Sequence, residues 1–347
     1  MYWLQCIEFF EFMAEKIRIK TLVDRLEFRF PFHIAHGTRT GTDAVFILLE
    51  WNGHFGIGEA TLPPYLQESI ESTLHFFHLP EVQELSWPLY PPDVFDHLSQ
   101  KVSGYMPAKA ALDMALWQLY ASIHEKSVGD ALSLSTKQNL TPHFFTIDVS
   151  DTETLRRKFD FAVENGFNHI KLKLDGECDE RMIEDYLRIG QFPFAVDANQ
   201  AWSDFNLSRS KTNWLKSEGC LFIEQPFKKE DVSLTKRLVE ESDMTIMADE
   251  ALQLPSDFSR ISEAFNAINL KLQKCGGLTP AMTLLEKAAD HGIPVMVGCM
   301  SESSVGCNAG EWIVPYCKWA DLDGPFLIRN DREIRQKLDD LMDKWNA

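Results

Sequence analysis

The sequence lacks features that define several common classes of protein. No apolar run is long enough to cross a bilayer. The seven cysteines are odd in number and never spaced C-x-x-C, which argues against a disulfide scaffold or a zinc site and predicts reduced thiols in a cytoplasmic protein. Positive charge is scarce, since 34 Lys and Arg face 52 Asp and Glu and give a net charge of −18. We therefore expect no binding to nucleic acid or to a membrane surface.

The first part of the chain predicts a small unit of strands followed by helices. Residues 1–13 are apolar but lack the basic start of a signal peptide, and we predict a poorly ordered extension there. In residues 14–142, alternating segments predict strands, with a hairpin that turns at Asn52-Gly53. Helical spacing then dominates up to about residue 130, and a helix is predicted to begin near Pro107.

From residue 143 the pattern changes to strands that alternate with amphipathic helices. Eight short apolar strands recur about every 25 residues, as in successive βα units. An open doubly wound sheet is the alternative, but no Gly-rich phosphate loop follows the first strand. The fold class is therefore predicted as α/β, with a modified TIM (β/α) barrel over residues 143–328 and a C-terminal helix over residues 329–347.

Acidic residues stand near the ends of three successive predicted strands. Asp197, Glu224 and Asp249 follow the third, fourth and fifth strands, and reactive groups of a βα barrel gather at these ends. Three converging carboxylates cannot all stay ionised without a cation. Oxygen donors without nearby His or Cys favour a hard ion, so we predict that these residues bind Mg²⁺, with salt bridges to lysines as the alternative. Asn199 and Glu250, beside them, are expected to support the ligands.

Lysines accompany these acids. In the strand HIKLKLD, Lys171 and Lys173 share one face, because side chains alternate along a strand. A metal cation and a neighbouring ammonium both lower the pKa of a lysine, so that one can act as a neutral base. Lys271 ends the sixth strand, nearly opposite in a ring of eight. A carbon acid held between Lys173 and Lys271 would meet a base on each face, which is what inversion of a carbon centre requires.

These motifs together resemble the enolase superfamily, in its muconate-lactonising subgroup. KLKLD resembles the K-x-K element, which implies that Lys173 is a base and that Lys171 helps to hold the substrate carboxylate. VDANQAW, IEQP and MADEA resemble the three metal-binding strands, and INLKLQKCGG resembles the strand that carries the second base, Lys271, with Lys274 on the following turn. The resemblance implies an α+β capping domain over residues 14–142, a catalytic barrel and Mg²⁺, the partner of a lysine base in this superfamily.

The eighth strand narrows the resemblance. DLDGP resembles the D-x-D of dipeptide epimerases such as L-Ala-D/L-Glu epimerase, where two acids bind the free ammonium of the substrate. Asp321 and Asp323 are two apart, so on a strand both side chains would point inward. The implied reaction is a 1,1-proton transfer at the α-carbon of the C-terminal residue of a dipeptide, through an enediolate. A loop-capping role is the alternative for either acid.

Substrate selection is expected from the capping domain. Its candidate loops are residues 33–43, with His33, His36 and Arg39, and residues 59–69. Arg39 would bind an acidic side chain of the substrate, or face solvent. After the seventh strand, Met300 is expected to shape the pocket, together with Cys299 and Glu302, whereas Met296 fits core packing equally well.

Two other functions remain open. The same lysines and metal would serve β-elimination or cycloisomerisation, as in o-succinylbenzoate synthase or muconate cycloisomerase, but those substrates offer no ammonium to the two aspartates. The barrel would otherwise be a metal-stabilised scaffold without turnover. The resemblance to related barrels allows a homo-oligomer, and the identity of the dipeptide stays open between acidic and hydrophobic side chains.

Overall fold

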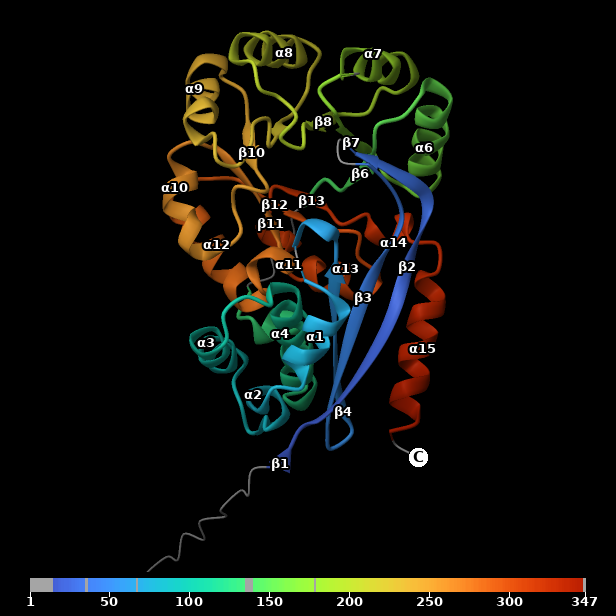
Figure 1. Cartoon of the computed structure of the whole chain (residues 1–347), viewed down its shortest axis with the longest axis vertical. Helices are drawn as coiled ribbons and strands as arrows, with labels where there is room; N and C mark the ends of the chain where they lie inside the picture. The colour runs from blue at the N-terminus through green and yellow to red at the C-terminus, as the bar shows by residue number, and fades with distance from the viewer. Residues whose placement is uncertain (1–14, 35–36, 67, 135–139, 178, 346–347) are drawn as a thin grey trace, which may run out of the picture.

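The computed structural model describes residues 15–34, 37–66, 68–134, 140–177 and 179–345. The predicted extension, residues 1–13, lies outside the described residues. Figure 1 shows two units, with long strands and short helices in the lower part and a ring of strands surrounded by helices above them. The lower unit is the N-terminal one, which we call the cap, and the upper one is the barrel.

The cap contains a three-stranded antiparallel sheet in the order β2-β3-β4. Its strands are β2 (Arg18–Ile34), β3 (Gly37–Trp51) and β4 (His54–Leu62). The predicted hairpin at Asn52-Gly53 is confirmed: Trp51 pairs with His54, and both turn residues have positive φ, at 49° and 82°. Such a turn matches the twist of the strands that it joins.

The expectation that residues 33–43 form a loop is wrong. The pairing of β2 with β3 continues through Phe32 with Arg39 and Ile34 with Gly37, after a register shift that begins at Glu27. Glycines and threonines at this end look like a loop in the sequence, but pairing with a partner strand supplies the hydrogen bonds that these residues need. The side chain of His33 and residues 35–36, including His36, lie outside the described part of the chain.

Helices cover one face of this sheet. Among them α4 (Met106–Ile123) is mostly buried, and it begins as predicted beside Pro107. Gly56 and Gly58 of β4 lie so close to α4 that an added Cβ would reach backbone atoms of Ala115 or Ala111 within 2 Å. The remaining cap elements are a 3-10 helix (Pro64–Leu66), α1 (Ile70–Phe77), α2 (Pro80–Gln83), α3 (Pro91–Lys101), α4 (Met106–Ile123), α5 (Val128–Ala131), and the short pair β1 (Glu15–Lys16) and β5 (Ser86–Trp87).

The predicted parallel barrel is confirmed. Eight strands follow one another in sequence order, and a bridge between His143 and Ala320 joins the last strand to the start of the first. The strands are β6 (Phe144–Ile147), β7 (His169–Lys173), β8 (Phe194–Asp197), β9 (Ile223–Glu224), β10 (Ile246–Ala248), β11 (Ala267–Lys271), β12 (Val295–Gly298) and β13 (Trp319–Asp321).

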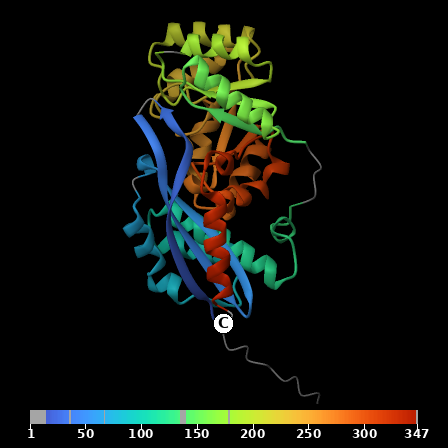
Figure 2. The ribbon, with the colours of Figure 1, turned by 90° about the vertical axis from the view of Figure 1, so that its right-hand side faces the viewer.

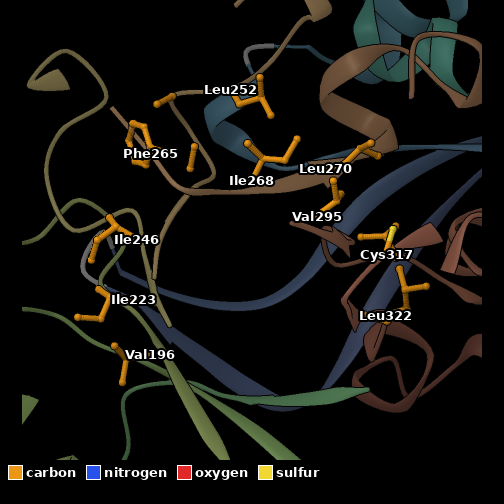
Figure 3. Close-up of a cluster of buried hydrophobic side chains, with 14 of the residues drawn as sticks. Val196, Ile223, Ile246, Leu252, Phe265, Ile268, Leu270, Val295, Cys317 and Leu322 are labelled. Atoms are coloured by element: carbon orange, nitrogen blue, oxygen red, sulfur yellow. The ribbon is translucent and has the colours of Figure 1, made fainter. Parts of the chain in front are cut away.

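Alternate residues of these strands face two different cores. Outward side chains such as Val196, Ile223 and Ile268 pack against the surrounding helices (Figure 3). Inward side chains such as Phe144, Phe222 and Met296 fill the barrel away from the strand ends that carry the charges. Met296 is therefore a packing residue. The helices are α6 (Thr152–Glu164), α7 (Asp179–Ile189), α8 (Phe205–Ser217), α9 (Val232–Ser242), α10 (Phe258–Ser262), α11 (Leu272–Cys275), α12 (Leu278–Asp290), α13 (Ser304–Glu311) and α14 (Gly324–Leu327), with 3-10 turns at Pro255–Asp257 and Val314–Tyr316.

The chain ends by returning to the cap. Helix α15 (Asp331–Asp343) runs along the cap strands in both views (Figure 2). Its buried residues Ile334 and Leu338 join Leu26 and Phe46 of the sheet in one hydrophobic cluster. The cap is thus packed against the chain segment that follows the barrel. Among the described residues, no helix is both long and apolar enough to span a membrane.

Candidate active site

A cavity of about 230 Å³ lies where the C-terminal ends of the barrel strands meet the cap. Its wall includes eight of the predicted site residues, namely Arg39, Lys171, Lys173, Asp249, Lys271, Met300, Asp321 and Asp323. Asp197 and Glu224 do not line it, because both side chains are completely buried. The structure therefore gathers residues in or directly after eight different strands at one place, β3 of the cap and β7 to β13 of the barrel.

The three predicted metal ligands form a compact buried cluster. Asp197 ends β8, Glu224 ends β9 and Asp249 follows β10, and one oxygen from each lies within 4.8 Å of the others. Burial, together with the charge of Asp197, raises the pKa of Glu224 to about 8. Three carboxylates so close together cannot all be ionised cheaply, and this donor set of buried oxygens fits a hard divalent cation.

Neighbouring residues also fit a cation at this position. Asn199 donates its backbone N–H to Oδ1 of Asp197, at 2.9 Å, and Asn269 donates from Nδ2 to Oε1 of Glu224, at 2.7 Å. Glu250 lies beside Asn199, and its Oε2 is buried without a hydrogen-bond partner among the described residues. An unpaired buried carboxylate oxygen is costly, and a nearby cation would stabilise it.

Two lysines approach this cluster from opposite sides. Lys173 Nζ lies 2.6 Å from Oδ2 of Asp197, and Lys271 Nζ lies 2.7 Å from Oδ2 of Asp249. Their strands, β7 and β11, are four apart in the ring of eight. Burial opposes ionisation of Asp249, but Lys271 and then Lys274 outweigh it and hold the pKa of this carboxyl well below its usual range. Both lysines line the cavity, and each pairs with a different carboxylate of the cluster.

Lys171 links the metal-ligand cluster to the eighth strand. Its ammonium is buried, lies 3.1 Å from Oε2 of Glu224 and forms a second ion pair with Asp321. Burial alone would lower the pKa of Lys171, but Asp321 and Glu224 raise it well above the usual value. Lys171 is thus held as a cation. The repulsion expected between two neighbouring lysines is offset because each pairs with a different carboxylate.

The two acids of DLDGP both reach the cavity, although not in the predicted way. Strand β13 ends at Asp321, and Asp323 already has helical dihedral angles at the start of α14. Asp321 accepts a hydrogen bond from Oγ1 of Thr146 at 3.0 Å, and Asp323 accepts one from the backbone N–H of Thr146 at 2.6 Å. The chain turns after Asp321, and bonding to β6 rather than strand alternation directs Asp323 inward. Burial raises its pKa to about 7.

The cap contributes Arg39 and Phe32 to the cavity. The guanidinium of Arg39 lies 5.5 Å from the ring centre of Phe28, and Lys173 Nζ lies 6.0 Å from that of Phe32. Met300, after β12, also lines the cavity and is 8% exposed. Arg39 therefore lies on the cap side of the same space as the two lysines.

Sequence reasoning missed two buried polar residues beside the site, Glu59 and Gln273, which are completely buried where the cap meets the barrel. Lys274 lies on the turn after β11, as expected, but its ammonium is 2.5 Å from Oδ1 of Asp249, a contact that was not predicted. Glu302 was expected to shape the pocket together with Cys299; Cys299 lines the cavity, whereas Glu302 is 2% exposed and is not part of the lining. The sequence did contain a signal for Glu59 and Gln273, because each is a polar residue inside a largely apolar segment, GIGEA and KLQKC. The sequence does not indicate which hydrogen-bond partner either residue has.

Two family descriptions match the chain. Residues 16–132 match the N-terminal domain of mandelate racemase and muconate lactonizing enzyme, and residues 154–311 match the enolase C-terminal domain-like family. The two matches cover the cap and the barrel, and they assign the fold and the site to the enolase superfamily.

Individual relatives narrow this class. The L-Ala-D/L-Glu epimerase of Bacteroides thetaiotaomicron is 34% identical, over 91% of this chain and 82% of the relative. The substrate-liganded structure of L-Ala-D/L-Glu epimerase from Bacillus subtilis superposes with a TM-score of 0.84 at 25% identity, over 91% of this chain and 92% of that one. A dipeptide epimerase from Methylococcus capsulatus, complexed with Mg and L-Arg-D-Lys, gives 0.80 at 26%, over 90% and 92%. The chain belongs to the dipeptide epimerase family of the enolase superfamily.

Proposed function

We propose that this protein is a Mg²⁺-dependent dipeptide epimerase that inverts the α-carbon of the C-terminal residue. The observation that carries the proposal is the placement of Lys173 and Lys271 on opposite sides of one carboxylate cluster in one cavity. β-Elimination or cycloisomerisation is not favoured, because Asp321 already pairs with Lys171 but the neighbouring Asp323 would have no ammonium of the substrate to bind, and because the relatives described above are epimerases.

The two lysines exchange protons with opposite faces of the substrate. In the proposed reaction one of them, neutral, takes the α-proton and becomes an ammonium. The other, already protonated, delivers a proton to the opposite face, so that the two lysines finish with their charge states exchanged. Both side chains are largely buried, at 14% and 8% exposed, and exclusion of water around a positioned acid and base strengthens their electrostatic interactions.

Asp197, Glu224 and Asp249 would hold the metal. When bound, the ion supplies positive charge that stabilises the negative charge developing on the substrate carboxylate as the α-proton leaves. Lys171 stays cationic between Glu224 and Asp321 and contributes positive charge near the same carboxylate. The residues of the chain thus provide both the cation site and the acid–base pair.

The ammonium of the dipeptide would bind at Asp321 and Asp323. Both carboxylates line the cavity on the β13 side, and neither is among the three clustered metal ligands. A dipeptide then has one charged end for each side of the cavity, with its reacting carbon between the two lysines. The proposed partner is therefore a small molecule. The expectations of a cytoplasmic location and of a homo-oligomer stay predictions.

The decisive experiment offers a library of dipeptides to the enzyme in D₂O and follows the α-protons by NMR. The wild type should exchange and invert at least one dipeptide. In Lys173→Gln and Lys271→Gln, inversion should fall by at least about 100-fold, the usual contribution of one acid or base. Each variant should keep exchanging one stereoisomer, because the remaining lysine still serves its own face.

The matched control is Lys229→Gln, which changes an exposed lysine on the wall of the same cavity. Exchange at normal rates in both single variants would contradict the assignment of the two bases. A wild type that introduces deuterium into no dipeptide at all would contradict the proposed function.

Arg39 is the residue that we propose binds the side chain of the substrate. If it binds a carboxylate, Arg39→Gln should slow acidic dipeptides by about tenfold or more and leave hydrophobic ones unchanged. Arg25→Gln, on the same hairpin and paired with Asp43 at 3.1 Å, is the control. Equal slowing of both substrate classes would assign Arg39 a structural role in the cap.

A further inference from the structure

Glu59 is a completely buried carboxylate at the junction of cap and barrel, and it does not line the cavity. It belongs to β4 of the cap, yet most of its partners belong to the barrel. Nothing in the proposed chemistry uses it. Burying a charged group of this kind is costly unless it is fully hydrogen-bonded, so its contacts indicate what it does.

Four donors converge on the two oxygens of Glu59. Oε1 accepts from Thr61 Oγ1 at 2.7 Å and from the backbone N–H of Ser303 at 2.9 Å. Oε2 accepts from Ser303 Oγ and from the backbone N–H of Gly306 at 3.0 Å. Ser303 is the N-cap residue of α13, and the first N–H groups of a helix have no partner within it. A carboxylate of the cap therefore holds the start of a barrel helix.

The segment that Glu59 holds is a wall of the cavity. Between the end of β12 at Gly298 and the fixed residue Ser303, the side chains of Cys299, Met300 and Ser301 all line the cavity. The backbone N–H of Cys299 donates to the carbonyl of Asp321 at 3.0 Å, which bonds the β12 end of this short wall to the barrel. Met300 and Ser301 lie between that bond and Ser303, so a shift at Ser303 would move side chains that face the cavity.

Two further side chains reinforce the same attachment. Glu302 accepts from the backbone N–H of Met300 at 2.7 Å and from Nε2 of Gln273 at 3.2 Å. Gln273 in turn donates to the backbone carbonyl of Glu59 at 2.8 Å and accepts from the N–H of Thr61 at 3.3 Å. The end of β4 is thus bound both to the wall after β12 and to the turn two residues beyond Lys271.

We propose that Glu59 is a positioning residue for substrate selection: from the cap, it fixes the wall Cys299–Ser303 against which the dipeptide is sorted. This inference rests on the proposed epimerase function. Loss of the Glu59 contacts would move the wall while leaving the lysines and the metal ligands in place. A displacement of about 1 Å costs up to about 100-fold in rate when it misplaces a substrate.

The test compares Glu59→Gln with Glu50→Gln. Gln keeps the shape of Glu59 but replaces one acceptor oxygen by an amide that cannot accept from Gly306. Glu50 lies on neighbouring β3 and is 2% exposed, against 0% for Glu59. Among the described residues its carboxylate bonds to Arg18 and Gly53, both of the cap. Each variant is assayed with Mg²⁺ on a panel of dipeptides that changes one residue at a time. Amide hydrogen exchange of residues 299–306 is measured in parallel.

Glu59→Gln should change the ratio of kcat/KM between small and large side chains by about tenfold or more. It should act mainly through KM, and should lose amide protection at Ser303 and Gly306. Glu50→Gln should leave all of these unchanged. Equal ratios in Glu59→Gln and wild type, or equal effects of the two variants, would overturn the inference. A wild type inactive on every dipeptide would instead overturn the proposed function.

Ser303→Ala keeps the test decisive if Glu59→Gln does not fold. It removes the hydroxyl, which donates to Glu59 and accepts from the backbone N–H of Val305 at 3.1 Å, but it retains the N–H of residue 303 that donates to Glu59. A smaller change of selectivity in the same direction is therefore expected. When both variants fold, the double variant should change selectivity by less than the sum of the two, because both act through one contact. Unaltered selectivity in a folded Ser303→Ala, or strict additivity, would contradict the inference.

Discussion

At the scale of single residues, the site is a network of opposite charges taken out of water. Lys173 holds Asp197, and Lys271 and Lys274 hold Asp249. The lysines and a metal ion compete for the same carboxylate oxygens, so binding of the ion would release Lys173 and Lys271 toward the substrate. Paired buried charges are costly to separate, which makes each member sensitive to substitution.

Asp323 provides a residue-scale test of ammonium binding. Asp323→Asn removes a charge but keeps an oxygen for the N–H of Thr146, so the fold should persist. For dipeptides with a free amine, kcat/KM should fall by about 10- to 100-fold, the value of a lost charged hydrogen bond. N-acetylated dipeptides, which have no ammonium, serve as the comparison. Equal losses for free and acetylated substrates would show that Asp323 only supports the wall of the site.

Asp113, far from the reacting groups, predicts a dependence of stability on pH. It is buried on α4 and bonds to the backbone and hydroxyl of Thr279, and burial raises its pKa from 3.8 to about 7. A carboxyl with a raised pKa stabilises the fold fully below pH 4, and this contribution is lost as pH rises toward 7. The loss amounts to at most about 4 kcal/mol, from about 1.4 kcal/mol per unit of pKa.

The measurement is urea unfolding of wild type and Asp113→Asn between pH 5 and pH 8. As pH rises toward 7, the free energy of unfolding of wild type should fall relative to that of the variant. Above pH 7 the difference between the two free energies should stay constant. Asp93→Asn, at an exposed position on α3, is the control and should follow wild type. A constant difference between Asp113→Asn and wild type across this range would mean that Asp113 is already ionised in the folded protein.

At the scale of elements, β4 connects the cap to the barrel. Its glycines let α4 approach on one face, and its C-terminal end carries Glu59 into the barrel junction. The strand therefore needs close packing and buried hydrogen bonds over only nine residues. A displacement of β4 would therefore displace the cavity wall Cys299–Ser303 as well.

Gly58→Ala tests this packing. Its new Cβ would lie 1.8 Å from the carbonyl oxygen of Ala111, so strand and helix must separate. We expect a loss of about 3 kcal/mol or more in the free energy of unfolding, at the upper end of the range for overpacking. Gly129→Ala on α5 meets no atom closer than 3.8 Å and should be neutral or slightly stabilising. Equal chemical stability of the two variants would show that β4 and α4 tolerate separation.

At the scale of the whole molecule, two units share one site. The cap supplies Phe32 and Arg39, the barrel supplies the lysines and carboxylates to which we assign acid–base chemistry and metal binding, and α15 packs back on the cap sheet. The large outer core of the barrel consists of apolar side chains that are independent of the charged cluster. Folding and metal binding should therefore be separable.

Metal removal tests that separation. With EDTA, epimerisation should be lost while the far-UV circular dichroism stays that of the folded protein, and excess Mg²⁺ should restore activity. Added Mg²⁺ should also raise the unfolding temperature, because it binds only the native cluster. Lys173→Gln, in which inversion is already at least about 100-fold slower with Mg²⁺ present, is the control for fold. A chain that unfolds in EDTA would favour the scaffold function instead.

The sequence by itself determined the barrel and most of its site. Alternation along short strands and acids at strand ends are local signals, and in a parallel barrel all strand ends meet at one rim. That is why Asp197, Glu224, Asp249, Lys173 and Lys271 were predictable without a structure.

Only the tertiary structure decided the rest. The contacts of Glu59 with Ser303 and of Gln273 with Thr61 join residues more than 200 positions apart. Likewise, Asp323 faces the cavity because Thr146 binds it after the strand has ended. Residues 37–43 look like a loop until they pair with β2. The physical reason is common to all: a buried polar group takes its orientation from its hydrogen-bond partner, and local sequence does not specify that partner.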